Sequence, residues 1–183
     1  MEISFIHLSD IHFRKTSGSS VDIDADLRNA ILTDIKINAK SILKNVKGIL
    51  VGGDIAFAGQ KKEYDFAREF LKEMTEQLGI DEKNVYCVPG NHDVNQALIK
   101  KSDSILNAQS KIEEANTIDE ADYTFGKYIT DEACPDLLYK PISEYNDFAV
   151  SYGCNIDQNR IVWTEEFLSL IHISEPTRLA LIS

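Results

Sequence analysis

The chain is short of cysteine and of positive charge, and each shortage excludes a class of protein. Its three cysteines, Cys87, Cys134 and Cys154, are odd in number and lack metal-site spacing. A disulfide framework is therefore excluded, and we expect free thiols in a reducing cytoplasm. The 183 residues carry 19 basic and 30 acidic side chains, for a formal charge of −11. This balance disfavours a broad surface for nucleic acid or for an anionic membrane.

Long hydrophobic runs are also absent. No apolar stretch reaches the roughly 20 residues that a membrane-spanning helix needs. The first six residues lack the basic start of a secretory signal, so we interpret them as part of a strand. The sequence thus predicts a cytoplasmic protein with no membrane partner. A hydrophobic content of 43% in 183 residues is sufficient for one domain with a substantial core.

The first half of the chain alternates between short apolar runs and helical periodicity. The runs predict strands over residues 3–8, 48–51 and 85–88. Apolar side chains at helical spacing predict helices over about 25–46 and 62–78, the second of them ending at Gly79. Strands that alternate with helices through short connections indicate an α/β fold with a parallel sheet and right-handed crossovers.

The pattern changes after Asp93. Residues 95–139 are polar and helical in pattern, and a short amphipathic helix is expected over about 142–152. We therefore divide the chain into an N-terminal half-domain, residues 1–94, and a second segment, residues 95–167. The second segment is expected to be a helical insertion or lid beside the site, together with a partial continuation of the same domain.

The last residues have a different character. Residues 168–183 resemble the conceptual translation of a widely used transposase sequencing adapter, continuing past its index. We expect natural sequence to end at Phe167, so that His172 should not be assigned as a metal ligand. A native amphipathic tail that matches by chance is the alternative, and genomic DNA across codon 168 distinguishes the two.

Three polar clusters directly follow the predicted strands. They are Asp10-Ile11-His12, Gly52-Gly53-Asp54 and Gly90-Asn91-His92-Asp93. Because the carboxyl ends of parallel strands meet at one edge of a sheet, their side chains should face one crevice. Carboxylate, imidazole and amide groups gathered in this way are typical of a two-metal hydrolase.

The first two clusters offer ligands for cations. Asp10 and His12 lie two residues apart, so in extended geometry both side chains point the same way and can grip one cation. Asp54 follows two glycines that allow a sharp turn, and its two carboxylate oxygens can bridge two metals. His7 lies within the first strand, where we expect a structural role near the core.

The third cluster offers a ligand and an acid. Asn91 has a neutral carbonyl oxygen, which is a weak but usable ligand. His92 can donate a proton near neutral pH, and Asp93 beside it can orient or charge the imidazole. Each cluster alone is a weak signal, whereas three in order at strand ends make a specific one.

These segments resemble the calcineurin-like metallophosphoesterase superfamily, whose pattern is DxH, then GD, then GNH followed by Asp or Glu. The resemblance implies a β-sandwich flanked by helices, of which this chain would hold the N-terminal βαβαβ half and lack the C-terminal half. Members also carry a later lone histidine and a Gly-His-x-His motif. The chain has no histidine between Asp93 and Phe167, so the resemblance implies a fragment with an incomplete metal site.

The resemblance also implies residue roles. Asp10 and His12 would bind a first metal, Asp54 would bridge two, and Asn91 would bind the second. His92 would protonate the leaving-group oxygen, supported by Asp93, while a metal-bridging hydroxide attacks phosphorus. The cofactors would be two divalent or trivalent ions of the Mn, Fe or Zn type.

The expected activity is that of a phosphodiesterase or phosphatase acting on a small phosphoester or nucleotide. A DNA nuclease of the same superfamily is the alternative, which the acidic balance and the lack of Lys/Arg clustering near the motifs disfavour. A non-catalytic interaction module with this fold, or an inactive fragment, is the alternative of another class. The sequence indicates no particular oligomeric state.

Overall fold

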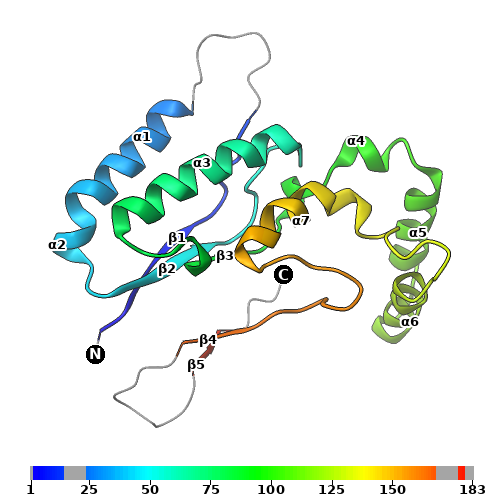
Figure 1. Ribbon diagram of the computed structural model, residues 1–183. Helices are drawn as coiled ribbons and strands as arrows, with labels where there is room; N and C mark the ends of the chain where they lie inside the picture. Colours follow the sequence, from blue (N-terminus) through cyan, green and yellow to red (C-terminus); the bar gives the residue numbers. More distant parts are fainter. Residues whose placement is uncertain (1, 15–23, 168–176, 180–183) are drawn as a thin grey trace.

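The computed structural model describes residues 2–14, 24–167 and 177–179 of the chain (Figure 1). Within these ranges lies a parallel sheet of three strands, β1 (Ser4–Leu8), β2 (Val46–Val51) and β3 (Val85–Cys87), in the order β1-β2-β3. Leu8 pairs with Val51, and Val51 pairs with Cys87, so the carboxyl ends of all three strands are level. The predicted α/β class and parallel sheet are confirmed.

Two helical segments cover one face of this sheet (Figure 1). The first runs through α1 (Ala25–Asp34), a π-helical turn (Ile35–Ala39) and α2 (Lys40–Ile42), and the second is α3 (Lys61–Leu78). Their buried side chains pack against strand residues that point to the same face: Ile49, Val51, Val85 and Cys87. This shared apolar layer is the core of the domain, and it fixes the strand ends relative to one another.

The first predicted helix is wrong at its end. The helix stops at Ile42, because Leu43 is extended with ψ 132° and Asn45 adopts a left-handed φ of 53°. Asn is among the residues that tolerate this conformation best. Strand β2 therefore begins at Val46, two residues before the predicted start.

Helix α3 follows the prediction closely. Glu63 accepts hydrogen bonds from the backbone N–H groups of Ala58 (3.0 Å) and Gln60 (2.9 Å), which closes the first turn. Gly79 ends the helix with φ 71°, a value that glycine adopts without a steric penalty. Tyr64, whose role in the site is described below, lies on the buried face of α3 and is 2% exposed.

The segment after Asp93 is helical, as predicted. It contains α4 (Gln96–Ile99), α5 (Asp103–Glu113), α6 (Ile118–Ile129) and α7 (Ser143–Ala149), with a 3₁₀ turn before α7 (Lys140–Ile142) and one after it (Val150–Tyr152). Helices α5 and α6 pair at the end of the molecule away from α1, whereas α7 packs on α3 (Figure 1). The hydroxyl of Tyr145 in α7 donates to the carbonyl of Cys87 at 2.9 Å, which ties α7 to β3. The role of this segment as a lid stays a prediction.

The opposite face of the sheet carries Phe5, His7 and Tyr86. Phe167 of β4 (Glu165–Phe167) contacts the rings of Phe5 and Tyr86 at centroid distances of 4.7 and 5.2 Å. His7 is exposed, so its predicted place near the core is wrong, because the alternation along β1 turns it away from the helices.

Strand β4 pairs antiparallel with β5 (Thr177–Leu179), which lies in the adapter-like segment. The rest of that segment, with His172, lies outside the described residues. None of the helices in the described ranges combines the length and the hydropathy that crossing a membrane requires.

Candidate metal centre

The loops that follow β1 and β2 run side by side and continue the parallel pairing of the strands. The backbone N–H of Gly52 donates to the Leu8 carbonyl (2.8 Å), and that of His12 donates to the Asp54 carbonyl (2.9 Å). The N–H of Phe13 then donates to the Ile55 carbonyl (2.8 Å). This register places His12 directly beside Asp54, which no spacing within the sequence could specify.

Three residues of the polar clusters other than glycine adopt left-handed backbone conformations. The φ values are 55° for Asp10, 52° for His12 and 50° for Asp54. For residues with a Cβ this region costs on the order of 1–3 kcal/mol each, and such residues concentrate at functional sites. The expectation that Asp10 and His12 share one direction through extended geometry is therefore wrong: the chain turns at both positions.

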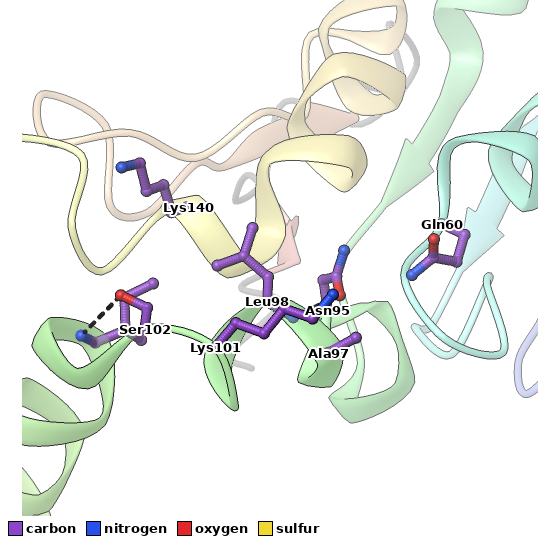
Figure 2. Close-up of a pocket in the computed structure, with 8 residues that line it drawn as sticks. Gln60, Asn95, Ala97, Leu98, Lys101, Ser102 and Lys140 are labelled. Carbon is purple, nitrogen blue, oxygen red and sulfur yellow. Dashed lines mark hydrogen bonds between the residues drawn. The ribbon is translucent and has the colours of Figure 1, made fainter.

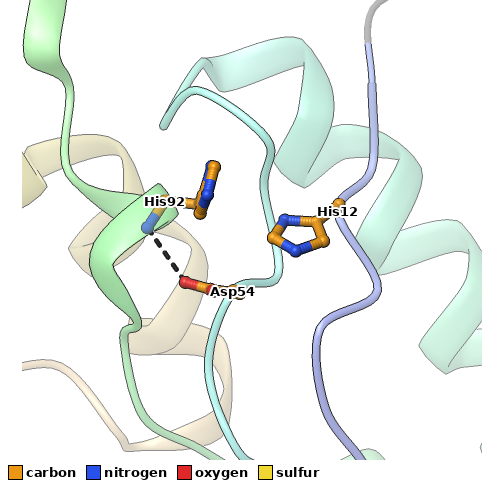
Figure 3. A group of neighbouring side chains, drawn as sticks. All are labelled: His12, Asp54 and His92. Carbon is orange, nitrogen blue, oxygen red and sulfur yellow. Dashed lines mark hydrogen bonds between the residues drawn. The ribbon is translucent and has the colours of Figure 1, made fainter.

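The loop after β3 joins this pair through Asp54. The backbone N–H of His92 donates to Oδ1 of Asp54 at 2.9 Å (Figure 3). Gly90 packs so closely on Asp54 that a Cβ at this position would collide with Oδ1 and with the backbone nitrogen. Glycine at position 90 is thus what lets the third loop approach the second.

His12, Asp54 and His92 form one group, with a possible ligand atom of each lying within 4.8 Å of the others (Figure 3). The two imidazole rings are 4.6 Å apart between centroids. Nδ1 of His12 is buried and has no hydrogen-bond partner among the residues that the structure describes, an arrangement that ordinarily costs about 1–3 kcal/mol. Imidazole and carboxylate groups gathered beside an unpaired buried nitrogen fit a divalent metal ion.

The imidazole of His92 is oriented by a backbone carbonyl. Its Nδ1 lies 2.8 Å from the carbonyl oxygen of Phe57. A carbonyl only accepts hydrogen bonds, so Nδ1 carries the proton and Nε2 remains for a ligand or for proton exchange. A histidine held in this way by a backbone carbonyl is a common arrangement beside metals.

Asp93 is fully buried and holds the loops together. Its carboxylate accepts hydrogen bonds from the backbone N–H groups of Ile55 (3.1 Å), Ala56 (2.8 Å) and Gly90 (2.8 Å) and from the Tyr64 hydroxyl (2.8 Å). Burial raises the pKa of Asp93, although these four donors act in the opposite direction. Burial, reinforced by the charge of Asp93, raises the pKa of Tyr64 far above its usual value, so the phenol remains a donor.

The predicted support of His92 by Asp93 is therefore indirect. The ring contacts the Phe57 carbonyl, and Asp93 instead fixes the backbone on either side of the site. The apolar spacing over residues 62–78 gives Tyr64 no role in the site, although a buried tyrosine hydroxyl usually needs a hydrogen-bond partner.

The other two predicted ligands, Asp10 and Asn91, lie at exposed positions of the same loops. Asp10 is exposed, and its carboxylate accepts a hydrogen bond from the Ser9 hydroxyl. Asn91 is exposed at the start of the 3₁₀ turn Asn91–Asp93. The structure thus brings together His12, Asp54 and His92, and it places Asp10 and Asn91 in the same loops at exposed positions.

One aromatic side chain, Phe57, borders the site and was not identified from the sequence. The Phe57 ring is 40% exposed and lies 5.5 Å from the His92 ring. The guanidinium of Arg14 stacks over Phe57, 4.2 Å from its centroid, a favourable cation–π geometry. A positive charge is therefore held close to the metal-binding group.

Comparison with known proteins agrees with this geometry. The sequence model of the calcineurin-like phosphoesterase family matches residues 3–167. The chain belongs to this family. The match ends at the residue before the adapter-like segment. Family membership supports a metal-dependent phosphoesterase and a hydrolase at the level of the class.

A relative from Bacillus subtilis (strain 168) gives weaker support. It is the uncharacterized metallophosphoesterase-like protein YydB, which is 26% identical to this chain over 122 residues. The aligned part is 66% of this chain but 24% of that protein, so the chain spans about a quarter of its relative.

Proposed function

We propose that this site hydrolyses phosphoester bonds of a small phosphoester or nucleotide, using two metal ions of the Mn, Fe or Zn type. The observation that carries the proposal is the convergence of His12, Asp54 and His92 from three strand ends, with the buried Nδ1 of His12 unpaired. His12 and Asp54 suit a first ion, and the proposal of a second rests on the family resemblance.

Asp54 would be the ligand common to both ions. One of its oxygens already accepts the N–H of His92 at 2.9 Å, which fixes the plane of the carboxylate. Asp10 and Asn91 would complete the coordination from the rim, with His12 as a first-ion ligand. When bound, the ions would supply an activated water as nucleophile and neutralise the charge that develops on the phosphoryl oxygens.

His92 would protonate the oxygen of the leaving group. The Phe57 carbonyl holds Nδ1–H, so the proton that is transferred must be carried on Nε2. Asp93 and Tyr64 would act as positioning residues, because they fix the backbone from Gly90 to Asp93 against Ile55 and Ala56.

The composition favours a phosphodiesterase or phosphatase that acts in the cytoplasm. The charge of −11 argues against a nuclease, since extended nucleic acid needs a positive surface. The intact donor group argues against a purely non-catalytic interaction module.

Turnover of bis-para-nitrophenyl phosphate with Mn²⁺ tests the proposal. Asp54→Ala should abolish Mn²⁺-dependent turnover, because both ions lose a ligand, whereas Asp65→Ala, an exposed carboxylate on α3, is the matched control and should retain it. Near-wild-type activity of Asp54→Ala would sink the assignment. Cleavage of single-stranded DNA under the same conditions would favour the nuclease.

A further inference from the structure

A cavity of about 510 Å³ lies between α4, the start of α5 and the turn that precedes α7 (Figure 2). Its volume is in the range of small-molecule sites. The lining residues come from the α3 N-cap, from the segment around α4 and α5, and from that turn: Gln60, Asn95, Ala97, Leu98, Lys101, Ser102, Ile105 and Lys140.

Two loops connect the cavity to the candidate metal centre along the chain. Asn95 lies three residues after His92, so their Cα atoms are at most about 11 Å apart. Gly59, which precedes Gln60, packs on the Asp93 carbonyl, where a Cβ would come within 2.8 Å. The N–H of Asn95 donates to the Pro141 carbonyl at 2.8 Å and so fixes the Lys140 turn beside the same loop.

The polar groups of the lining are mainly donors. Lys101 and Lys140 come from separate elements, no acidic residue lines the cavity, and neither lysine forms an ion pair with any residue in the described ranges. The Oδ1 of Asn95 accepts the N–H of Leu98 (3.0 Å), which leaves the amide NH₂ as a donor. The hydroxyl oxygen of Ser102 accepts the N–H of Ile105 (3.5 Å; Figure 2), which leaves its O–H.

We propose that this cavity binds a second phosphate group carried by the leaving group of the substrate. The inference rests on the proposed function: if His92 protonates the leaving-group oxygen, the leaving group lies beside His92, and the Cα of Asn95 in the cavity lining is at most about 11 Å from that of His92. In a chain of net charge −11, two unpaired ammonium groups around one cavity match a phosphate dianion. The substrate class becomes a phosphoester with a further phosphate, such as a nucleoside bisphosphate.

Binding of inorganic pyrophosphate in EDTA tests the cavity without catalysis. We compare the full chain with Lys101→Gln/Lys140→Gln and, as the matched control, Lys100→Gln, an exposed neighbour that does not line the cavity. The double variant should bind pyrophosphate about tenfold or more weakly, while Lys101→Arg/Lys140→Arg and Lys100→Gln should bind as the wild type does. Absence of binding by the wild type, or equal binding by the double variant, overturns the cavity assignment.

A kinetic comparison tests the role of the cavity in the reaction. With Mn²⁺, the double glutamine variant should lose about tenfold in kcat/KM for adenosine 3′,5′-bisphosphate relative to 5′-AMP, while turnover of bis-para-nitrophenyl phosphate stays unchanged. An unchanged ratio overturns the leaving-group assignment. If no ester is turned over, the proposed function fails, and with it the leaving-group role, whereas the pyrophosphate measurement still decides whether the cavity binds phosphate.

Discussion

The hydroxyl of Tyr64 donates a 2.8 Å hydrogen bond to Oδ1 of Asp93, a carboxylate that is fully buried beneath the candidate metal centre. The bond joins the first turn of α3, the longest helix in the described ranges, to the loop that carries His92. The stability of the core and the shape of the site are therefore linked through one pair of side chains.

Tyr64→Phe removes this bond and leaves the ring in place. Because a buried carboxylate loses a donor, we expect the free energy of unfolding to fall by about 1.5–3 kcal/mol, measured by urea denaturation. Tyr123→Phe, at a ring that is 65% exposed, is the control and should change it by less than about 0.5 kcal/mol. Equal stabilities for the two variants would show that Asp93 does not depend on Tyr64.

Gly90→Ala tests the close approach of the second and third loops. The backbone at Gly90, with φ −103°, suits alanine, so the effect should be steric alone. The added Cβ meets Asp54, and we expect a loss of at least about 2 kcal/mol of stability together with weaker Mn²⁺ binding, measured by denaturation and calorimetry.

Gly126 in α6 provides the matched glycine control, because a Cβ there meets nothing within 4 Å. Gly126→Ala should stabilise the protein by roughly 0.5–1 kcal/mol, as expected for alanine in a helix. Mn²⁺ binding by Gly90→Ala at the wild-type level would contradict the packing of these loops.

His92→Ala separates the acid role from metal binding. We expect turnover of esters with poor leaving groups to slow far more than turnover of activated para-nitrophenyl esters, because only the former need a proton in the transition state. Mn²⁺ affinity should fall less than in Asp54→Ala, because His92 is the proposed proton donor and Asp54 is a proposed ligand. Equal losses on both classes of ester would exclude His92 as the general acid.

The cysteines should differ sharply in reactivity. Cys134 is exposed, whereas Cys87 and Cys154 are buried, and burial raises the pKa of the Cys87 thiol well above its usual value. Ellman's reagent at pH 8 should therefore modify one thiol of the native protein, and none in Cys134→Ser. Rapid modification of the native Cys134→Ser variant would show that Cys87 or Cys154 is open to solvent.

Much of the fold could be predicted because its elements carry strong local patterns. The stripe of α3 and its glycine cap specify the helix without reference to the rest of the chain. The end of the first helix could not be placed, because helical spacing continues to Val46, while pairing with Ser4 draws that residue into β2. Local periodicity contains no information about this pairing between distant residues, which outweighs the helical preference.

The sequence indicated which residues gather in this group, but it did not indicate how they are arranged. The three clusters named His12, Asp54 and His92, but their contact depends on the backbone register between loops and on the left-handed turns at His12 and Asp54. The partners of Asp93 come from residues up to 38 positions away, so sequence adjacency to His92 was a poor guide to what its carboxylate binds.

The most direct test of the account is a crystal structure of the full chain grown with Mn²⁺, with anomalous data collected near the manganese edge. The account predicts an anomalous peak within coordination distance of Asp54 and of a nitrogen of His12, and the loss of this peak in Asp54→Ala. No peak beside Asp54 at millimolar Mn²⁺, or one that persists in Asp54→Ala, would contradict the assignment of a metal-dependent phosphoesterase site.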